Sequence, residues 1–209
     1  MRPDVRLIAI LDPAAVGATA LEAALAAEAG GATILQVRMK NSGGAEVLAW
    51  TERLVRALEI PVWVNDRADV AWLGGAAGVH LGADDLPADR VRAGSPHALH
   101  IGISVGTPPE ADRARAMRAD YWSLGSVYAT DSKPDAGAPI GLAGFARLAG
   151  LAPSGVPCVA IGGVTAERIA EVCAAGARGV AAIGAVFGAP DIERAARRLR
   201  DAVDAALGS

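Results

Sequence analysis

The sequence has few of the residues that mark several large classes of protein. It contains only two cysteines, Cys158 and Cys173, both in apolar segments, so neither a disulfide framework nor a C-x-x-C metal site is predicted. Aromatic residues make up 4% of the chain, which predicts an aliphatic core. No Pro/Ser-rich linker and no low-complexity tract divides the sequence, and this favours a single domain over residues 1–209.

A strong charge of either sign is also missing. The chain has 20 Lys and Arg against 23 Asp and Glu, which gives a net charge of −3. Without a large basic field, general nucleic-acid binding is not expected. The first 15 residues contain one short apolar run that Asp12 interrupts, and this predicts neither a signal sequence nor a membrane span. We therefore expect a cytoplasmic protein without a membrane partner.

What the sequence does have is a regular alternation of short β-type runs and amphipathic helical patterns. A spacing of roughly 20 to 25 residues between runs indicates parallel strands with crossover helices. Eight such units in one small domain predict an α/β fold, a closed (βα)₈ TIM barrel, with an open doubly wound sheet as the alternative. The expected strands are residues 5–12, 33–39, 61–66, 78–82, 100–105, 121–127, 157–163 and 179–186.

Cationic residues follow the second expected strand. In a barrel, chemistry takes place on the loops at the C-terminal ends of the strands. Gln36, Arg38 and Lys40 are alternate residues and should project on one face. Two cations on one face indicate an anion site.

Carboxylates follow the third and fourth expected strands, at Asp66 and Asp85. Oxygen ligands on adjacent loops suit Mg²⁺, which usually takes one or two carboxylates and completes its shell with water and substrate phosphates. For Asp85, the N-cap of a helix beginning near Pro87 is an open alternative.

The remaining strand ends add hydroxyls and glycines. Ser104 ends the fifth strand, and the Gly162-Gly163 pair and Gly184 allow backbone N–H groups to approach a phosphate closely. The segment 128–141 has no apolar period, and we expect it to be a lid that brings Thr130, Ser132 and Lys133 over the barrel mouth, with a merely exposed loop as the alternative. Two phosphorylated ligands and one divalent metal ion are therefore predicted.

Seven segments resemble the thiamine phosphate synthase family, in a superfamily that also contains thiazole tautomerases. The resemblance runs in order through nearly the whole chain, and the combination of motifs is specific although no single piece is. The segments are QVRMK (36–40), VNDRADVA (64–71), GVHLGADDLP (78–87), GISV (102–105), DYWSLGSVYATDSK (120–133), AIGGV (160–164) and GVAAIGAV (179–186).

The resemblance implies a transferase of thiamine biosynthesis. It joins hydroxymethylpyrimidine diphosphate to thiazole phosphate and releases pyrophosphate through a carbocation-like centre. Asp66 and Asp85 would hold Mg²⁺ on the leaving diphosphate, and Gln36 would contact the pyrimidine. The diphosphate oxygens would be held by Arg38, Lys40, Asn65, Ser104 and Lys133. The thiazole phosphate would be held by Thr130, Ser132, Gly162, Gly163, Ile183 and Gly184.

The sequence also departs from the family pattern. Ala83 stands where the usual motif has Gln, Gly106 where a His is common, and Gly184 where a Ser is usual, which puts the fine shape of the two substrate pockets in question. A thiazole tautomerase is one alternative, but its catalytic His position is occupied here by Ser126. A non-catalytic paralogue that binds thiazole phosphate or thiamine phosphate is another.

One surface feature bears on assembly. The neighbourhood of Trp50, Trp63 and Trp72 is expected to be exposed and apolar, and it could pack in a homodimer.

Overall fold

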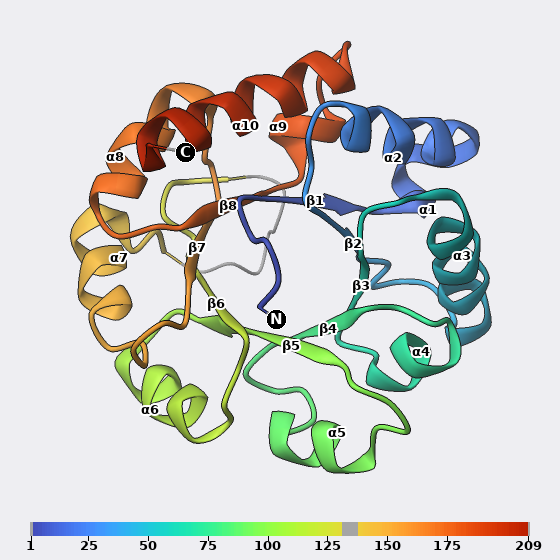
Figure 1. Ribbon diagram of the computed structural model, residues 1–209, viewed down its shortest axis with the longest axis horizontal. Coiled ribbons are helices and arrows are strands. Elements are labelled where there is room, and N and C mark those ends of the chain that lie inside the picture. The colour runs from blue at the N-terminus through green and yellow to red at the C-terminus, as the bar shows by residue number, and fades with distance from the viewer. Residues whose placement is uncertain (1, 131–137, 209) are drawn as a thin grey trace.

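A computed structural model describes residues 2–130 and 138–208. Its eight parallel strands form one closed barrel in chain order, and β1 closes the ring by pairing with β8 (Figure 1). The helices form an outer ring around the strands. The predicted (βα)₈ barrel is confirmed, and the open sheet is excluded because its first and last strands would be unpaired edges.

The strands are short, with four to six residues each. Their bounds are β1 Leu7–Leu11, β2 Ile34–Val37, β3 Val62–Asn65, β4 Gly78–Leu81, β5 His100–Val105, β6 Tyr121–Leu124, β7 Cys158–Ile161 and β8 Gly179–Ala182. All eight lie inside the ranges expected from the sequence. Most end earlier than expected, because the last residues of each run leave the hydrogen-bonded ladder and form the rim.

Helices of very different length connect the strands. Along β1 to β4 they are α1 Pro13–Val16, η1 Gly17–Thr19, α2 Ala20–Ala29, α3 Gly44–Ala57 and α4 Ala68–Leu73. Along the second half they are α5 Ala88–Gly94, α6 Pro108–Ala116, α7 Gly141–Ala149, η2 Ala166–Arg168, α8 Ile169–Ala174, α9 Gly184–Phe187 and α10 Ile192–Leu207. The expected eighth strand ran to residue 186, but its end forms α9.

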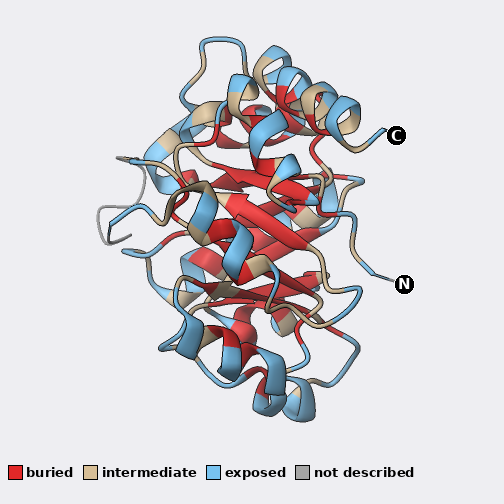
Figure 2. Ribbon diagram, turned by 90° about the vertical axis from the view of Figure 1, so that its left-hand side faces the viewer, coloured by how far each residue is buried: buried red, intermediate tan, exposed pale blue. Residues whose placement is uncertain are grey.

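The core has two layers because each strand is buried on both faces. In β1, Ile8 and Ile10 belong to a cluster inside the barrel, whereas Leu7, Ala9 and Leu11 belong to the larger cluster between strands and helices. Figure 2 shows the buried strands in the centre and the exposed faces of the helices outside. This alternation explains why the runs read as almost continuously apolar.

Two aromatic rings fill the barrel interior, and two glycines make room for them. Trp63 and Tyr121 lie with their ring centroids 5.4 Å apart. A Cβ at Gly78 would lie 2.6 Å from the Trp63 ring, and one at Gly102 would lie 2.3 Å from the Tyr121 ring. The glycines in β4 and β5 are therefore required by packing, not by backbone conformation.

The prediction that Trp50, Trp63 and Trp72 form an exposed neighbourhood is wrong for Trp63. Trp63 is fully buried inside the barrel, while Trp50 and Trp72 are only half-buried outside it. The sequence could not tell which face of β3 carries the larger side chain, because both faces are buried.

Within residues 2–130 and 138–208, no helix is both long enough and apolar enough to cross a bilayer.

Candidate functional site

A cavity of about 900 Å³ opens at the C-terminal ends of the strands and is lined by residues from all eight strand ends. Twelve of the residues predicted from the sequence line it together. They are Gln36, Arg38, Lys40, Asn65, Asp66, Asp85, Ser104, Thr130, Gly162, Gly163, Ile183 and Gly184. Two further predicted residues, Ser132 and Lys133, lie outside the described residues, as does half of the expected lid, residues 131–137.

The end of β2 supplies the cations. Gln36 is buried in the strand, and Arg38 and Lys40 follow it on the same face and line the cavity. Met39, between the two cations, is 7% exposed and packs into the outer core. The alternation predicted from the sequence therefore continues beyond Val37, where β2 ends.

A hydrogen bond joins the side-chain amides of Gln36 in β2 and Asn65 in β3. Gln36 Nε2 donates to Asn65 Oδ1 over 2.9 Å. Because this bond uses the carbonyl oxygen of Asn65, it leaves the Asn65 amide nitrogen as a donor, and it leaves the Gln36 carbonyl oxygen as an acceptor. The two side chains thus present opposite polarity to the cavity.

Two carboxylates meet between β3 and β4. Burial, the hydrogen bond with Asp85 and the charge of Asp85 raise the pKa of Asp66 from 3.8 to about 6, against the opposing effect of Lys40 and Arg38. A pair of carboxylates in contact needs a shared proton or a cation between them. This is the arrangement expected of two ligands of one divalent cation.

Backbone contacts hold each of the two acidic residues in place. Asp66 has a φ of 66°, a left-handed conformation that few non-glycine residues adopt and that often occurs at functional sites. Its N–H donates to the His80 carbonyl over 2.8 Å, which ties it to β4. Asp85 Oδ2 accepts from the Gly82 N–H over 2.6 Å, and α5 has Pro87 as its N-cap residue without a side-chain cap. The helix-capping alternative for Asp85 is therefore wrong.

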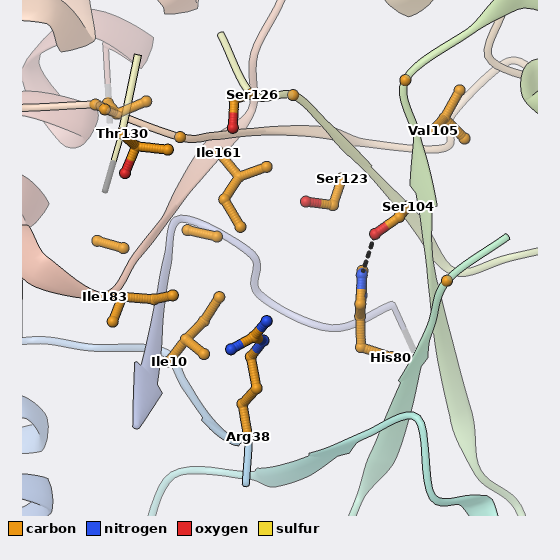
Figure 3. A pocket seen from close by; sticks show the side chains of 18 of the residues that line it. Ile10, Arg38, His80, Ser104, Val105, Ser123, Ser126, Thr130, Ile161 and Ile183 are labelled. Carbon is orange, nitrogen blue, oxygen red and sulfur yellow. Dashed lines mark hydrogen bonds between the residues drawn. The ribbon is translucent and has the colours of Figure 1, made fainter. Parts of the chain in front are cut away.

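A hydrogen-bond chain runs from the barrel interior to the cavity. The Tyr121 hydroxyl lies 2.7 Å from His80 Nδ1, and His80 Nε2 lies 2.9 Å from Ser104 Oγ. Figure 3 shows the bond between His80 and Ser104, with Arg38 reaching toward the middle of the cavity. His80 also lines the cavity, although it is not among the site residues predicted from the sequence.

The burial of Tyr121 determines which groups donate in this series of hydrogen bonds. Tyr121 is 1% exposed, and burial raises the pKa of its phenol, so the hydroxyl stays protonated. No other acceptor for it occurs among the described residues, and an unpaired buried O–H is costly. Tyr121 therefore donates to Nδ1 of His80, and Nε2–H of His80 donates to Ser104. The Ser104 hydroxyl is left to donate its own proton into the cavity.

The opposite wall comes from the ends of β6, β7 and β8. Figure 3 places Thr130 and Ile183 there, across the cavity from Ser104 and His80. Gly162 and Gly163 have φ values of 90° and 63°, and a Cβ at Gly163 would lie 2.5 Å from the Ala129 carbonyl oxygen. The glycine pair is thus needed for the close approach of the β7 loop to the β6 loop.

The positions that depart from the family pattern also line this cavity. Ala83, Gly106 and Gly184 are all in its wall, as is Ser126, which is 7% exposed. The Gly106 N–H donates to Glu110 Oε2 over 2.6 Å, so this backbone is held by the first turn of α6 without a side chain of its own.

Metal-binding groups are few in this wall. The described residues contain no cluster of three or more His, Cys, Asp or Glu side chains able to hold a metal ion. A cation at Asp66 and Asp85 would therefore need water or a bound ligand to complete its coordination, which is the habit of Mg²⁺.

Comparison with known proteins gives one consistent answer. The model of the thiamine monophosphate synthase family matches residues 7–186. A thiamine-phosphate synthase of Methanoculleus marisnigri is 46% identical over 196 residues, which cover 91% of this chain and 90% of that protein. One of Agrobacterium fabrum is 41% identical, with 98% and 96% covered. The solved structure of a thiamine phosphate pyrophosphorylase from Pyrococcus furiosus superposes with a TM-score of 0.86 at 35% identity and covers 99% of both chains.

Proposed function

Because the chain belongs to the thiamine monophosphate synthase family, we propose that the cavity at the C-terminal end of its barrel is the active site of that activity. The protein is a thiamine phosphate synthase, a transferase that couples hydroxymethylpyrimidine diphosphate with thiazole phosphate and releases pyrophosphate. The observation that carries the assignment of this cavity is the contact between Asp66 and Asp85 beside Arg38 and Lys40.

The donor set suits Mg²⁺. Two carboxylate oxygens in contact, one of them with a raised pKa, favour a hard divalent cation that prefers oxygen ligands. Asp66 and Asp85 would hold it, and when bound it would neutralise charge on the departing diphosphate. Water and the diphosphate itself would supply the other ligands.

The chain's own residues bind and orient the diphosphate. Arg38 and Lys40 face its oxygens, and the Asn65 amide and the Ser104 hydroxyl are both left as donors by the bonds that fix them. Lys133, from the sequence motif, adds a further cation. These donors stabilise the electron pair that leaves with pyrophosphate when the carbon–oxygen bond breaks.

The second substrate lies against the β6–β8 wall. Thr130, Ser132 and the backbone of Gly162, Gly163, Ile183 and Gly184 would hold its phosphate, while the thiazole nitrogen faces the pyrimidine carbon and forms the new carbon–nitrogen bond. Gln36 would accept a hydrogen bond from the pyrimidine amino group through its free carbonyl oxygen. Catalysis then depends on the alignment of two bound substrates and on charge stabilisation.

No side chain is required as a nucleophile. His80 is held between Tyr121 and Ser104, and Ser126 occupies the position at which the tautomerase alternative would need a His. The site therefore favours coupling over isomerisation of the thiazole.

The homodimer stays a prediction. With Trp63 inside the barrel, the apolar surface near α3 and α4 includes Leu73, which is 71% exposed. Light scattering of the purified protein would give its mass in solution.

Binding of magnesium pyrophosphate tests the proposed diphosphate site. Calorimetric titration should give a measurable affinity for wild type that falls at least about tenfold in Asp85→Asn, because one metal ligand is lost. Asp112→Asn is the control: Asp112 is exposed on α6 and does not line the cavity, so its variant should bind like wild type. Equal affinities for all three proteins would refute the assignment of Asp85.

A further inference from the structure

The charges of the cavity wall are divided unequally between its two halves. The half built from β2 to β5 carries two cations and four carboxylates, which are Arg38, Lys40, Asp66, Asp84, Asp85 and Glu110. In the half built from β6 to β8, Arg168 is the single charged residue among those the structure describes. Arg168 is not among the site residues predicted from the sequence.

Arg168 is held in place by a backbone carbonyl group and an aromatic ring. Its Nη1 donates to the Gly163 carbonyl oxygen over 2.7 Å, and its Cζ lies 4.3 Å from the centroid of the Tyr128 ring. The hydroxyl of Tyr128 donates to Glu171, which fixes the ring. Within residues 2–130 and 138–208, no carboxylate forms an ion pair with Arg168.

This geometry leaves most of the guanidinium available. An arginine has five N–H donors in a planar fork, and one bond to Gly163 accounts for one of them. The stacking contact with Tyr128 uses the face of the group and not its edge. Arg168 is thus a half-buried cation, oriented before any ligand arrives, at the end of η2, which follows the Gly162-Gly163 pair.

We propose that Arg168 binds the phosphate of thiazole phosphate and makes the site discriminate against the unphosphorylated thiazole alcohol. The inference rests on the proposed function of this cavity. A phosphate monoester in the β6–β8 half meets one cation and no described carboxylate, so it needs no metal ion there. A diphosphate suits the other half, where carboxylates and cations lie together.

The alternative is that Arg168 only supports the β7 loop through its bond to Gly163. The two roles differ in what a substitution changes. A supporting role would affect both substrates and the melting temperature together, whereas a phosphate-binding role changes the response to one substrate and to one functional group on it.

The test compares wild type, Arg168→Gln and Arg168→Lys with thiazole phosphate and with thiazole alcohol, at saturating pyrimidine diphosphate and Mg²⁺. We expect Arg168→Gln to raise the KM for thiazole phosphate at least about tenfold, the effect of losing one charge-assisted hydrogen bond. The KM for the pyrimidine diphosphate should stay within about twofold, and the preference for phosphate over alcohol should fall at least about tenfold. Arg168→Lys, which keeps the charge, should recover part of both losses.

Arg178→Gln is the matched control. Arg178 is an exposed arginine that precedes β8, whereas Arg168 follows β7, so the same loss of charge occurs far from the cavity. It should leave both KM values and the preference unchanged. An unchanged preference in Arg168→Gln, or equal losses for both substrates, would overturn the proposal.

Direct binding separates this inference from the proposed function. If wild type does not couple the two substrates, the proposed function fails. Calorimetry with thiazole phosphate and thiazole alcohol then still decides the role of Arg168. Tighter binding of the phosphate by wild type that is lost in Arg168→Gln supports the inference, and equal binding of the two ligands by wild type contradicts it.

Discussion

Replacing Asp66 by Asn should stabilise the metal-free protein and abolish its response to Mg²⁺. Asn keeps the shape of the side chain, can donate to Asp85 as a protonated Asp66 would, and tolerates the left-handed φ of 66° better than other non-glycine residues. The substitution therefore removes a charge with little other change.

The size of the effect follows from the raised pKa. A rise from 3.8 to about 6 corresponds to about 3 kcal/mol of unfavourable free energy for the ionised group. Because Asp66 is only half-buried, solvent screening reduces the expected gain in the free energy of unfolding to about 1–2 kcal/mol.

The pH dependence has a definite sign. A carboxyl with a raised pKa in the folded state destabilises the fold where it is ionised, so stability is lost as pH rises from about 4 through about 6. The advantage of Asp66→Asn should thus be complete above about pH 7 and should disappear toward pH 4.

Urea unfolding measures this directly. Wild type, Asp66→Asn and the exposed control Asp112→Asn are compared at pH 8 in the presence of a chelator and again with Mg²⁺. The control should change the free energy of unfolding by less than about 0.5 kcal/mol. Mg²⁺ should stabilise wild type and the control, by binding the folded state, but not Asp66→Asn. If Asp66→Asn is no more stable than wild type in the chelator, or keeps the full Mg²⁺ effect, the reasoning about the carboxylate pair is wrong.

Three further results are expected. Tyr121→Phe removes the hydroxyl at the start of the hydrogen-bond chain that ends at Ser104, so kcat should fall about tenfold with little change in melting temperature; an unchanged kcat would contradict the role of the chain. Gly78→Ala places a Cβ 2.6 Å from the Trp63 ring and should lower the free energy of unfolding by about 1–3 kcal/mol, as urea denaturation would show; a neutral effect would mean that the ring can move aside. Lys133→Ala should weaken inhibition by pyrophosphate about tenfold in competition assays against the pyrimidine diphosphate; unchanged inhibition would place Lys133 outside the diphosphate site.

The barrel was predictable because its signal repeats. Eight β-type runs at a regular spacing admit few folds, and the alternation of Gln36, Arg38 and Lys40 correctly placed all three on the cavity face. The same rule also located Asp66 and Asp85 at one rim, since adjacent parallel strands end on the same side.

The parts that could not be predicted depend on which buried face a residue occupies. Trp63 lies inside the barrel, and the only sequence signals for this are the glycines at 78 and 102, whose meaning depends on strand register. His80 and Tyr121 stand in apolar strand patterns, which indicate core residues. Their polar contacts with each other and with Ser104 appear only when β4, β5 and β6 are aligned. Arg168 lies beyond a strand end in a helical turn, where an arginine is ordinarily a solvated surface residue.

The most direct test of the account is a coupling assay with the purified protein. Hydroxymethylpyrimidine diphosphate, thiazole phosphate and Mg²⁺ are supplied together and then omitted one at a time, while thiamine phosphate and pyrophosphate are quantified. We expect both products to form in equal amounts, only when all three components are present, and thiazole phosphate alone not to be isomerised. Metal-independent isomerisation of thiazole phosphate with no coupled product would contradict the proposed function.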